Sequence, residues 1–121
     1  MVKEIISKVG VPRIDGIIHC SGGAQTKVLH FVENKHVIKD NLFKTPIIFD
    51  LIQSESKTSW KEMYQVFNMG HRLEIYTDEI TAQNIIDICN SYDLEAKIIG
   101  RVEDSKSNKL SIIGEKGTFE Y

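Results

Sequence analysis

Glu62-Met63-Tyr64-Gln65-Val66-Phe67-Asn68-Met69-Gly70 joins an amphipathic segment to an Asn-Met-Gly turn, and strand-like sequence follows directly. Ser59 and Glu62 have the spacing of a capping box, which predicts a helix that begins after Ser59. We expect Gly70 to close this helix. Four apolar residues recur at helical spacing and are expected to face the core: Trp60, Met63, Tyr64 and Phe67.

The rest of the chain alternates short helical and strand patterns. Thr45-Pro46 resembles a helix start with a hydroxyl cap, and an apolar stripe follows at Ile47, Ile48, Leu51 and Ile52. Further helices are expected over residues 2–9, 24–32 and 80–91. Strands are expected over residues 14–20, 36–39, 72–77, 96–102 and 110–113, the last two as a hairpin. Strands joined through helices predict an α/β (α+β) fold with a mixed β-sheet covered by helices.

Length and composition exclude several classes of protein. A chain of 121 residues with net charge −2 fits a single domain over residues 1–121 and has no general attraction to nucleic acid or an anionic membrane. Cys20 and Cys89 form no CxxC pair, so we expect a reducing, cytoplasmic environment rather than a disulfide framework. No apolar run approaches the roughly 20 residues of a membrane span, and no signal peptide is visible.

The first candidate site is Gly16-Ile17-Ile18-His19-Cys20-Ser21-Gly22-Gly23, at a junction between a strand and a helix. Glycines allow backbone N–H groups to approach an anion, and Ser21 adds a hydroxyl donor. We predict that Ser21, Gly22 and Gly23 bind phosphate and that His19, at the strand end, is catalytic. The alternative is a tight turn with a histidine packed at the end of a strand.

The second candidate site is Asn68-Met69-Gly70-His71-Arg72. Asn68 offers amide donors, and His71 with Arg72 can hold phosphate, so Asn68, Gly70, His71 and Arg72 are predicted to bind substrate or phosphate. The alternative is a helix C-cap with Gly70 in the left-handed conformation and exposed basic side chains.

Other polar residues are weaker candidates. His30 and His36, with His19 and Cys20, match no compact zinc spacing, so no metal site is expected. Asp50 is expected to face water and Glu62 to serve the helix cap. Cys20 and His19 are adjacent strand residues with opposite directions and do not form a nucleophilic dyad.

Four blocks of the chain resemble the C-terminal domain of aminoimidazole ribonucleotide (AIR) synthetase, the cyclo-ligase family of purine biosynthesis. The first two are Gly16–Gly23, similar to that family's Gly-x-Ala-His-x-(Thr/Ser)-Gly-Gly-Gly, and Pro46–Gln53, similar to its Pro-x-Ile-Phe-x-x-Ile-Gln helix. The others are Glu62–Gly70, the most specific string, and Ile99–Val102, similar to its Ile-Gly-x-Val strand. The blocks occur in the family's order and cover most of the chain.

The resemblance implies one part of a two-domain enzyme whose N-terminal ATP-binding domain is absent from this chain. ATP and Mg²⁺ would be bound mainly by that missing domain. The partners implied are a nucleotide substrate, the N-terminal domain and a second copy in a homodimer, and the fragment alone is expected to be inactive. The reaction implied is ATP-dependent closure of formylglycinamidine ribonucleotide to aminoimidazole ribonucleotide.

The chain also departs from the family pattern. Ala24 stands where a third glycine is usual, and the family's Glu-Asn and Pro-Arg are replaced at Lys27, Val28, His30 and Phe31. These departures leave two alternatives open. One is another ATP-dependent member of the superfamily, such as a selenophosphate synthetase or hydrogenase-maturation relative, and the other is a non-catalytic small-molecule-binding or regulatory domain.

Overall fold

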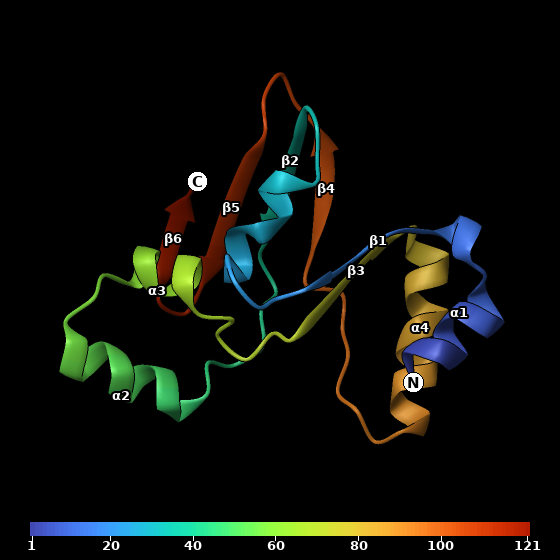
Figure 1. Ribbon diagram of the computed structural model, residues 1–121, viewed down its shortest axis with the longest axis horizontal. Helices are drawn as coiled ribbons and strands as arrows, with labels where there is room; N and C mark the ends of the chain where they lie inside the picture. Colours follow the sequence, from blue (N-terminus) through green and yellow to red (C-terminus); the bar gives the residue numbers. More distant parts are fainter. The chain divides into compact units, whose positions relative to one another are not determined.

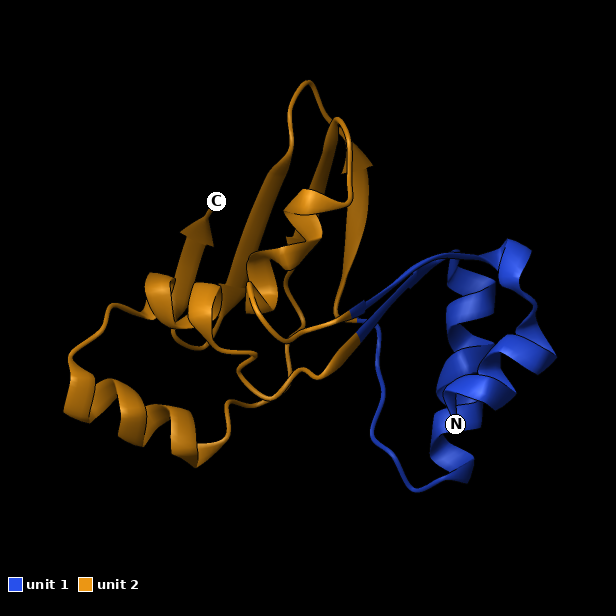
Figure 2. Cartoon of the chain, in the orientation of Figure 1, with its two compact units in different colours: residues 1–18, 74–98 blue, residues 19–73, 99–121 orange.

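The computed structural model describes residues 1–121, which form two compact units (Figure 2). The first unit comprises residues 1–18 and 74–98, and the second comprises residues 19–73 and 99–121. All the predicted site residues, His19–Gly23 and Asn68–Arg72, lie in the second unit. That residues 1–121 fold as a single domain stays a prediction.

The first unit is built around a pair of helices, α1 (Val2–Val9) and α4 (Glu79–Ser91) (Figure 1). Their apolar faces meet in a core of Ile5, Ile85, Ile88 and Cys89. Asp78 caps α4, since its carboxylate accepts hydrogen bonds from the amide and the hydroxyl of Thr81 at 2.9 and 2.7 Å. The short 3₁₀ helix η1 (Val11–Arg13) leads into β1 (Ile14–His19), which pairs with β3 (Leu73–Thr77). The expected helices over 2–9 and 80–91 are confirmed, as are the strands over 14–20 and 72–77 to within two residues.

The second unit is organised by a four-stranded mixed sheet in the order β4-β2-β5-β6. These strands are β4 (Gly100–Asp104), β2 (Lys35–Lys39), β5 (Lys109–Gly114) and β6 (Gly117–Glu120). The central strands β2 and β5 run parallel, with Val37 opposite Leu110, and both outer strands pair antiparallel. The buried residues Val37, Ile38, Leu110 and Ile112 come from these central strands. The expected α+β fold with a mixed sheet is therefore confirmed.

The expected hairpin between residues 96–102 and 110–113 is wrong. The two strands never pair, because β2 lies between them and the actual hairpin is β5 with β6. The last three residues of β2 are buried, as expected for a central strand, whereas the charged and exposed residues of β4 suit an edge. Gly100 is required by the close approach of β4 to β2, since a side chain there would overlap the carbonyl oxygen of Ile38.

Three helical segments complete the second unit: η2 (Ala24–His30), α2 (Ile47–Ser56) and α3 (Trp60–Val66). The helix expected over 24–32 is a seven-residue 3₁₀ helix, η2, which contacts both α3 and β5. The capping by Ser59 is confirmed, because its Oγ accepts a hydrogen bond from the amide of Glu62 at 3.3 Å. Gly70, however, does not close α3, which already ends at Val66 with Phe67 as its C-cap.

The expected apolar stripe lies on α2, but the rest of the protein does not bury it. No residue of α2 is buried, and Ile47 is 75% exposed. The cap is also different from the expectation: Pro46 occupies the N-cap position, and the amide of Thr45 donates instead to Glu115 at 2.9 Å.

Met63 is the apolar residue of α3 on which packing depends most. Met63 is fully buried, whereas Trp60 and Phe67 are only half-buried. We expect Met63→Ala to lower the free energy of unfolding by about 2–5 kcal/mol through lost burial and a residual cavity. Val66→Ala, at an exposed position of the same helix, should change it by less than about 0.5 kcal/mol. Urea denaturation of both variants measures the difference, and equal effects would contradict this placement of the core.

Candidate functional site

The structure brings the two candidate segments together within the second unit. The amide of Cys20 donates to the carbonyl oxygen of Arg72 at 2.9 Å, directly beyond the paired strands β1 and β3. Gln25 adds a second link, because its Nε2 donates to the carbonyl oxygen of Asn68 at 2.8 Å. Segments separated by more than forty positions in the sequence thus form one local structure.

The Ser21-Gly22-Gly23 turn presents unused donors to solvent. The amide of Ser21 donates to the His19 carbonyl at 2.8 Å, and that of Ala24 donates to the Ser21 carbonyl at 2.9 Å. Between them, the amides of Gly22 and Gly23 have no acceptor in the protein, and both residues are exposed. Ala24 follows with φ of 41°, a conformation that glycine adopts at less cost. The turn can therefore donate two backbone hydrogen bonds to a ligand.

His19 and Lys27 flank this turn. His19 is exposed at the end of β1, and its ring has no hydrogen-bond partner. Lys27 reaches back from η2, so that its Nζ lies 3.0 Å from the His19 carbonyl oxygen and 3.2 Å from Ser21 Oγ. The sequence singled out Lys27 only as a departure from the family pattern, because nothing local shows that a lysine six residues after Ser21 turns back to it.

Asn68-Met69-Gly70-His71 forms a tight turn of type I′. Met69 and Gly70 have φ of 53° and 94°, and the His71 amide donates to the Asn68 carbonyl at 3.0 Å. Asn68 Oδ1 also accepts from the Gly70 amide at 2.9 Å. Gly70 is pressed against Pro46, where an added Cβ would lie 2.9 Å from two ring carbons. The Asn-Met-Gly string is thus explained by backbone geometry and by contact with the start of α2.

His71 and Arg72 differ in accessibility. His71 is buried, its Nε2 accepts a hydrogen bond from the Phe43 amide at 3.2 Å, and its ring lies 5.0 Å from that of Phe43. The Nε2 atom of His71 is therefore not available to accept a hydrogen bond from a ligand. Arg72 is exposed, with its backbone fixed by Cys20 and its guanidinium in no ion pair. Of the predicted phosphate ligands, the exposed ones are Ser21, Gly22, Gly23, Gly70 and Arg72.

A buried polar network supports both segments. Lys39, the last residue of β2, is 1% exposed, and its Nζ donates to the carbonyl oxygen and to Oε1 of Gln25 at 2.9 and 2.8 Å. Gln25 is fully buried and in turn donates to Asn68. Sequence analysis missed Lys39 and Gln25, because polar residues in a short strand and a short helix are ordinarily exposed. Only the tertiary structure shows their burial.

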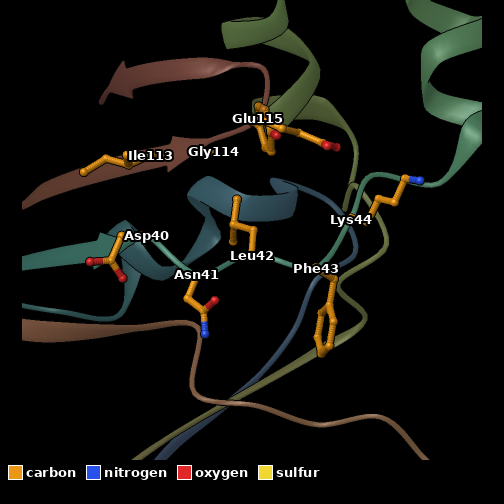
Figure 3. A pocket seen from close by; sticks show the side chains of 9 residues that line it. Asp40, Asn41, Leu42, Phe43, Lys44, Ile113, Gly114 and Glu115 are labelled. Carbon is orange, nitrogen blue, oxygen red and sulfur yellow. The ribbon is translucent and has the colours of Figure 1, made fainter.

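A separate cavity of about 220 Å³ lies between the segment after β2 and the turn joining β5 to β6 (Figure 3). Its lining includes Asp40, Leu42, Phe43, Tyr64 and Glu115. None of the predicted site residues lines it. Hydrogen bonds from the amide and hydroxyl of Thr45 lower the pKa of Glu115, and burial raises the pKa of Tyr64.

The structure groups no three histidine, cysteine or acidic side chains in a way that could hold a metal ion. None of its helices combines the length and the apolar character that crossing a lipid bilayer requires.

Comparison with known proteins gives a family match over most of the chain. Residues 7–113 match the sequence model of the AIR synthase related protein C-terminal domain. The phosphoribosylformylglycinamidine cyclo-ligase of Methanocaldococcus jannaschii is 34% identical over 109 residues, covering 89% of this chain and 31% of the relative. The enzyme of the same name from Methanococcus vannielii is 33% identical over 106 residues, covering 86% of the chain and 30% of the relative. The chain therefore spans about 30% of the length of these relatives.

Gly70 and Gly22 provide a matched pair for testing the turn geometry. Gly70→Ala should destabilise the protein by roughly 1–3 kcal/mol, because the left-handed backbone is strained for alanine and its Cβ would contact Pro46. Gly22→Ala should have little effect, since nothing lies within 4 Å of the added methyl group. The melting temperatures of both variants are compared with that of wild type. A wild-type melting temperature for Gly70→Ala would contradict the left-handed, closely packed geometry described for Gly70.

The stability of the second unit should depend on the charge of Glu115. Because the folded pKa of Glu115 lies below its ordinary value of 4.5, its contribution is present above pH 4.5 and is lost as pH falls through the folded pKa. The melting temperature of Glu115→Gln should therefore lie below that of wild type at pH 7, and the gap should narrow below pH 4.5. Glu33→Gln, at an exposed residue, serves as control. A gap that stayed constant with pH would contradict the expected role of the charge.

Proposed function

The chain belongs to the family of AIR synthase related protein C-terminal domains, and from this membership we propose that it is the C-terminal domain of a phosphoribosylformylglycinamidine cyclo-ligase. The proposed reaction is ATP-dependent ring closure of formylglycinamidine ribonucleotide to aminoimidazole ribonucleotide. The names of the relatives favour this activity over the other members of the superfamily considered above.

We assign binding of ATP and Mg²⁺ to the part of the relatives that lies outside the matched region. The residues of this chain do not fit a metal site, because no three candidate ligands come together. No step through a metal is therefore assigned to this chain. A homodimer is proposed on the resemblance alone, and a cytoplasmic location on the two free cysteines, Cys20 and Cys89.

The observation that carries the proposal is the cluster of accessible donors in the second unit. The Gly22 and Gly23 amides and the Ser21 hydroxyl belong to one exposed turn, and the hydrogen bond from the Cys20 amide holds the backbone of the exposed Arg72 next to it. Hydrogen-bond donors fixed in this way stabilise the charge of a phosphoryl group without reorganisation during the reaction. We propose that this turn contacts a phosphate group of the substrate or product.

His19 is the proposed proton carrier. In ring closure, ATP supplies the phosphoryl group that activates the formamide oxygen. The attacking amidine nitrogen must lose a proton, and the imidazole of His19, exposed beside the turn, can accept one on an unprotonated ring nitrogen. Asn68, Gly70 and His71 remain proposed contributors to substrate binding, through the shape of the turn that they form next to Arg72.

A chimeric enzyme tests this function directly. Residues 1–121 would replace the matched segment of the Methanocaldococcus jannaschii cyclo-ligase, and ADP release would be measured with formylglycinamidine ribonucleotide and ATP. We expect turnover by the chimera and none by residues 1–121 alone. A chimera that folds, as judged by a cooperative thermal transition, but releases no ADP would contradict the proposal.

In the same chimera, His19→Ala should reduce turnover about 100-fold or more, the usual scale for loss of a general acid or base, without changing the melting temperature. His30→Ala, at another exposed histidine of the second unit, is the matched control and should retain activity. Wild-type turnover by His19→Ala would remove His19 from the site.

A further inference from the structure

The positive charge at the Ser21–Gly23 turn has to come from a side chain. The helix that follows, η2, is a 3₁₀ helix of seven residues, too short and too irregular to supply the field of an α-helix macrodipole. Two neutral amides and a hydroxyl hold a dianion in water only weakly without a cation nearby. Arg72 is tied to Cys20 through its backbone carbonyl, whereas the ammonium group of Lys27 contacts the turn itself.

The stem of Lys27 is packed along the turn. An added side chain at Gly23 would contact Lys27 Cβ at 3.5 Å and Cγ at 3.8 Å, so the aliphatic part of the lysine lies against that glycine. The half-buried stem directs Nζ to the His19 carbonyl and Ser21 Oγ. The ammonium is thereby fixed at the turn before any ligand arrives, which reduces the entropy lost on binding.

The charge of Lys27 is not neutralised within the protein. Both oxygens that it contacts are uncharged, and Lys27 forms no ion pair. Its ammonium has three donors, of which two are used, leaving one for a ligand. Because Ser21 Oγ accepts from Lys27, the Ser21 hydroxyl hydrogen is free to donate outward.

We propose that Lys27 is a phosphate-binding side chain of this protein, and that it forms one anion site with the Ser21 hydroxyl and the amides of Gly22 and Gly23. The chemical class of the ligand is a phosphate dianion, either free phosphate or a phosphate monoester of a sugar or nucleotide. The inference deepens the proposed function by assigning the cation at the turn, and it rests on that function for the biological source of the phosphate.

NMR titration of the ¹⁵N-labelled 121-residue chain tests the site, with inorganic phosphate and ribose 5-phosphate as separate probes and chloride at matched ionic strength as the blank. We expect either probe to shift the amides of Ser21, Gly22 and Gly23 in wild type. Tighter binding of ribose 5-phosphate would identify the monoester, and equal binding would identify the phosphate group alone as the ligand.

Lys27→Met retains the packed stem and removes the charge, and it should weaken phosphate binding by about tenfold or more, the scale of one lost charge-assisted hydrogen bond. Lys27→Arg should restore binding at least partly. Lys106→Met, in the exposed turn between β4 and β5, is the matched control and should bind as wild type does. Overlay of the amide spectra away from the turn establishes that each variant is folded.

Unchanged affinity in a folded Lys27→Met variant would overturn the assignment of Lys27, and an absence of phosphate shifts at the turn in wild type would overturn the site. Neither result decides the cyclo-ligase activity, which the chimera measures independently through ADP release. Failure of this inference and failure of the proposed function are therefore distinguishable.

Discussion

The arrangement of the second unit depends on one buried hydrogen-bonded chain, from Lys39 through Gln25 to Asn68. Removing an ammonium group from water is costly unless polar partners replace the water, and Gln25 supplies two such partners. Gln25 cannot satisfy Lys39 and reach Asn68 unless η2 and the 68–71 turn both lie against the end of β2. The polar requirement of one buried lysine therefore positions both segments of the candidate site.

Some of the predicted site residues maintain the shape of the site, and others are accessible to a ligand. Asn68 and Gly70 form the type I′ turn, and Gly70 also packs against Pro46. The imidazole of His71 accepts a hydrogen bond from the amide of Phe43. Apart from Arg72, the predicted ligands that keep accessible donors are on the neighbouring turn, where the amides of Gly22 and Gly23 have no acceptor in the protein. In this account, the most specific string in the sequence holds the site in place, and the glycine-rich turn contacts the phosphate.

The spacing of apolar residues predicted the helices, because the apolar face of a helix is formed by residues that are close together in the sequence. Met63 in α3 is buried where helical spacing placed it, and the helices expected over residues 2–9 and 80–91 bury Ile5, Ile85 and Cys89. The sheet order could not be predicted in the same way, because pairing of β2 between β4 and β5 depends on contacts distant in the sequence. The strand β6 was missed for lack of an alternating apolar pattern.

The candidate site was predicted in part for the same reason. Glycine and serine at a strand end indicate a turn on their own, so Ser21, Gly22 and Gly23 could be named from the sequence. The contacts of Lys27, Gln25 and Lys39 form only when η2 packs against the turn and against β2. No pattern of neighbouring residues in the sequence predicts that packing.

Amide hydrogen exchange in wild type and Lys39→Met tests the central claim most directly. If the buried chain holds both segments, exchange at Cys20, Ala24 and His71 should accelerate together in the variant, although His71 is distant in sequence from the other two. The amide of Tyr92, in the first unit, should keep its wild-type rate. Acceleration limited to Ala24 and the residues next to it, with His71 unchanged, would contradict the claim that one buried lysine positions both halves of the site.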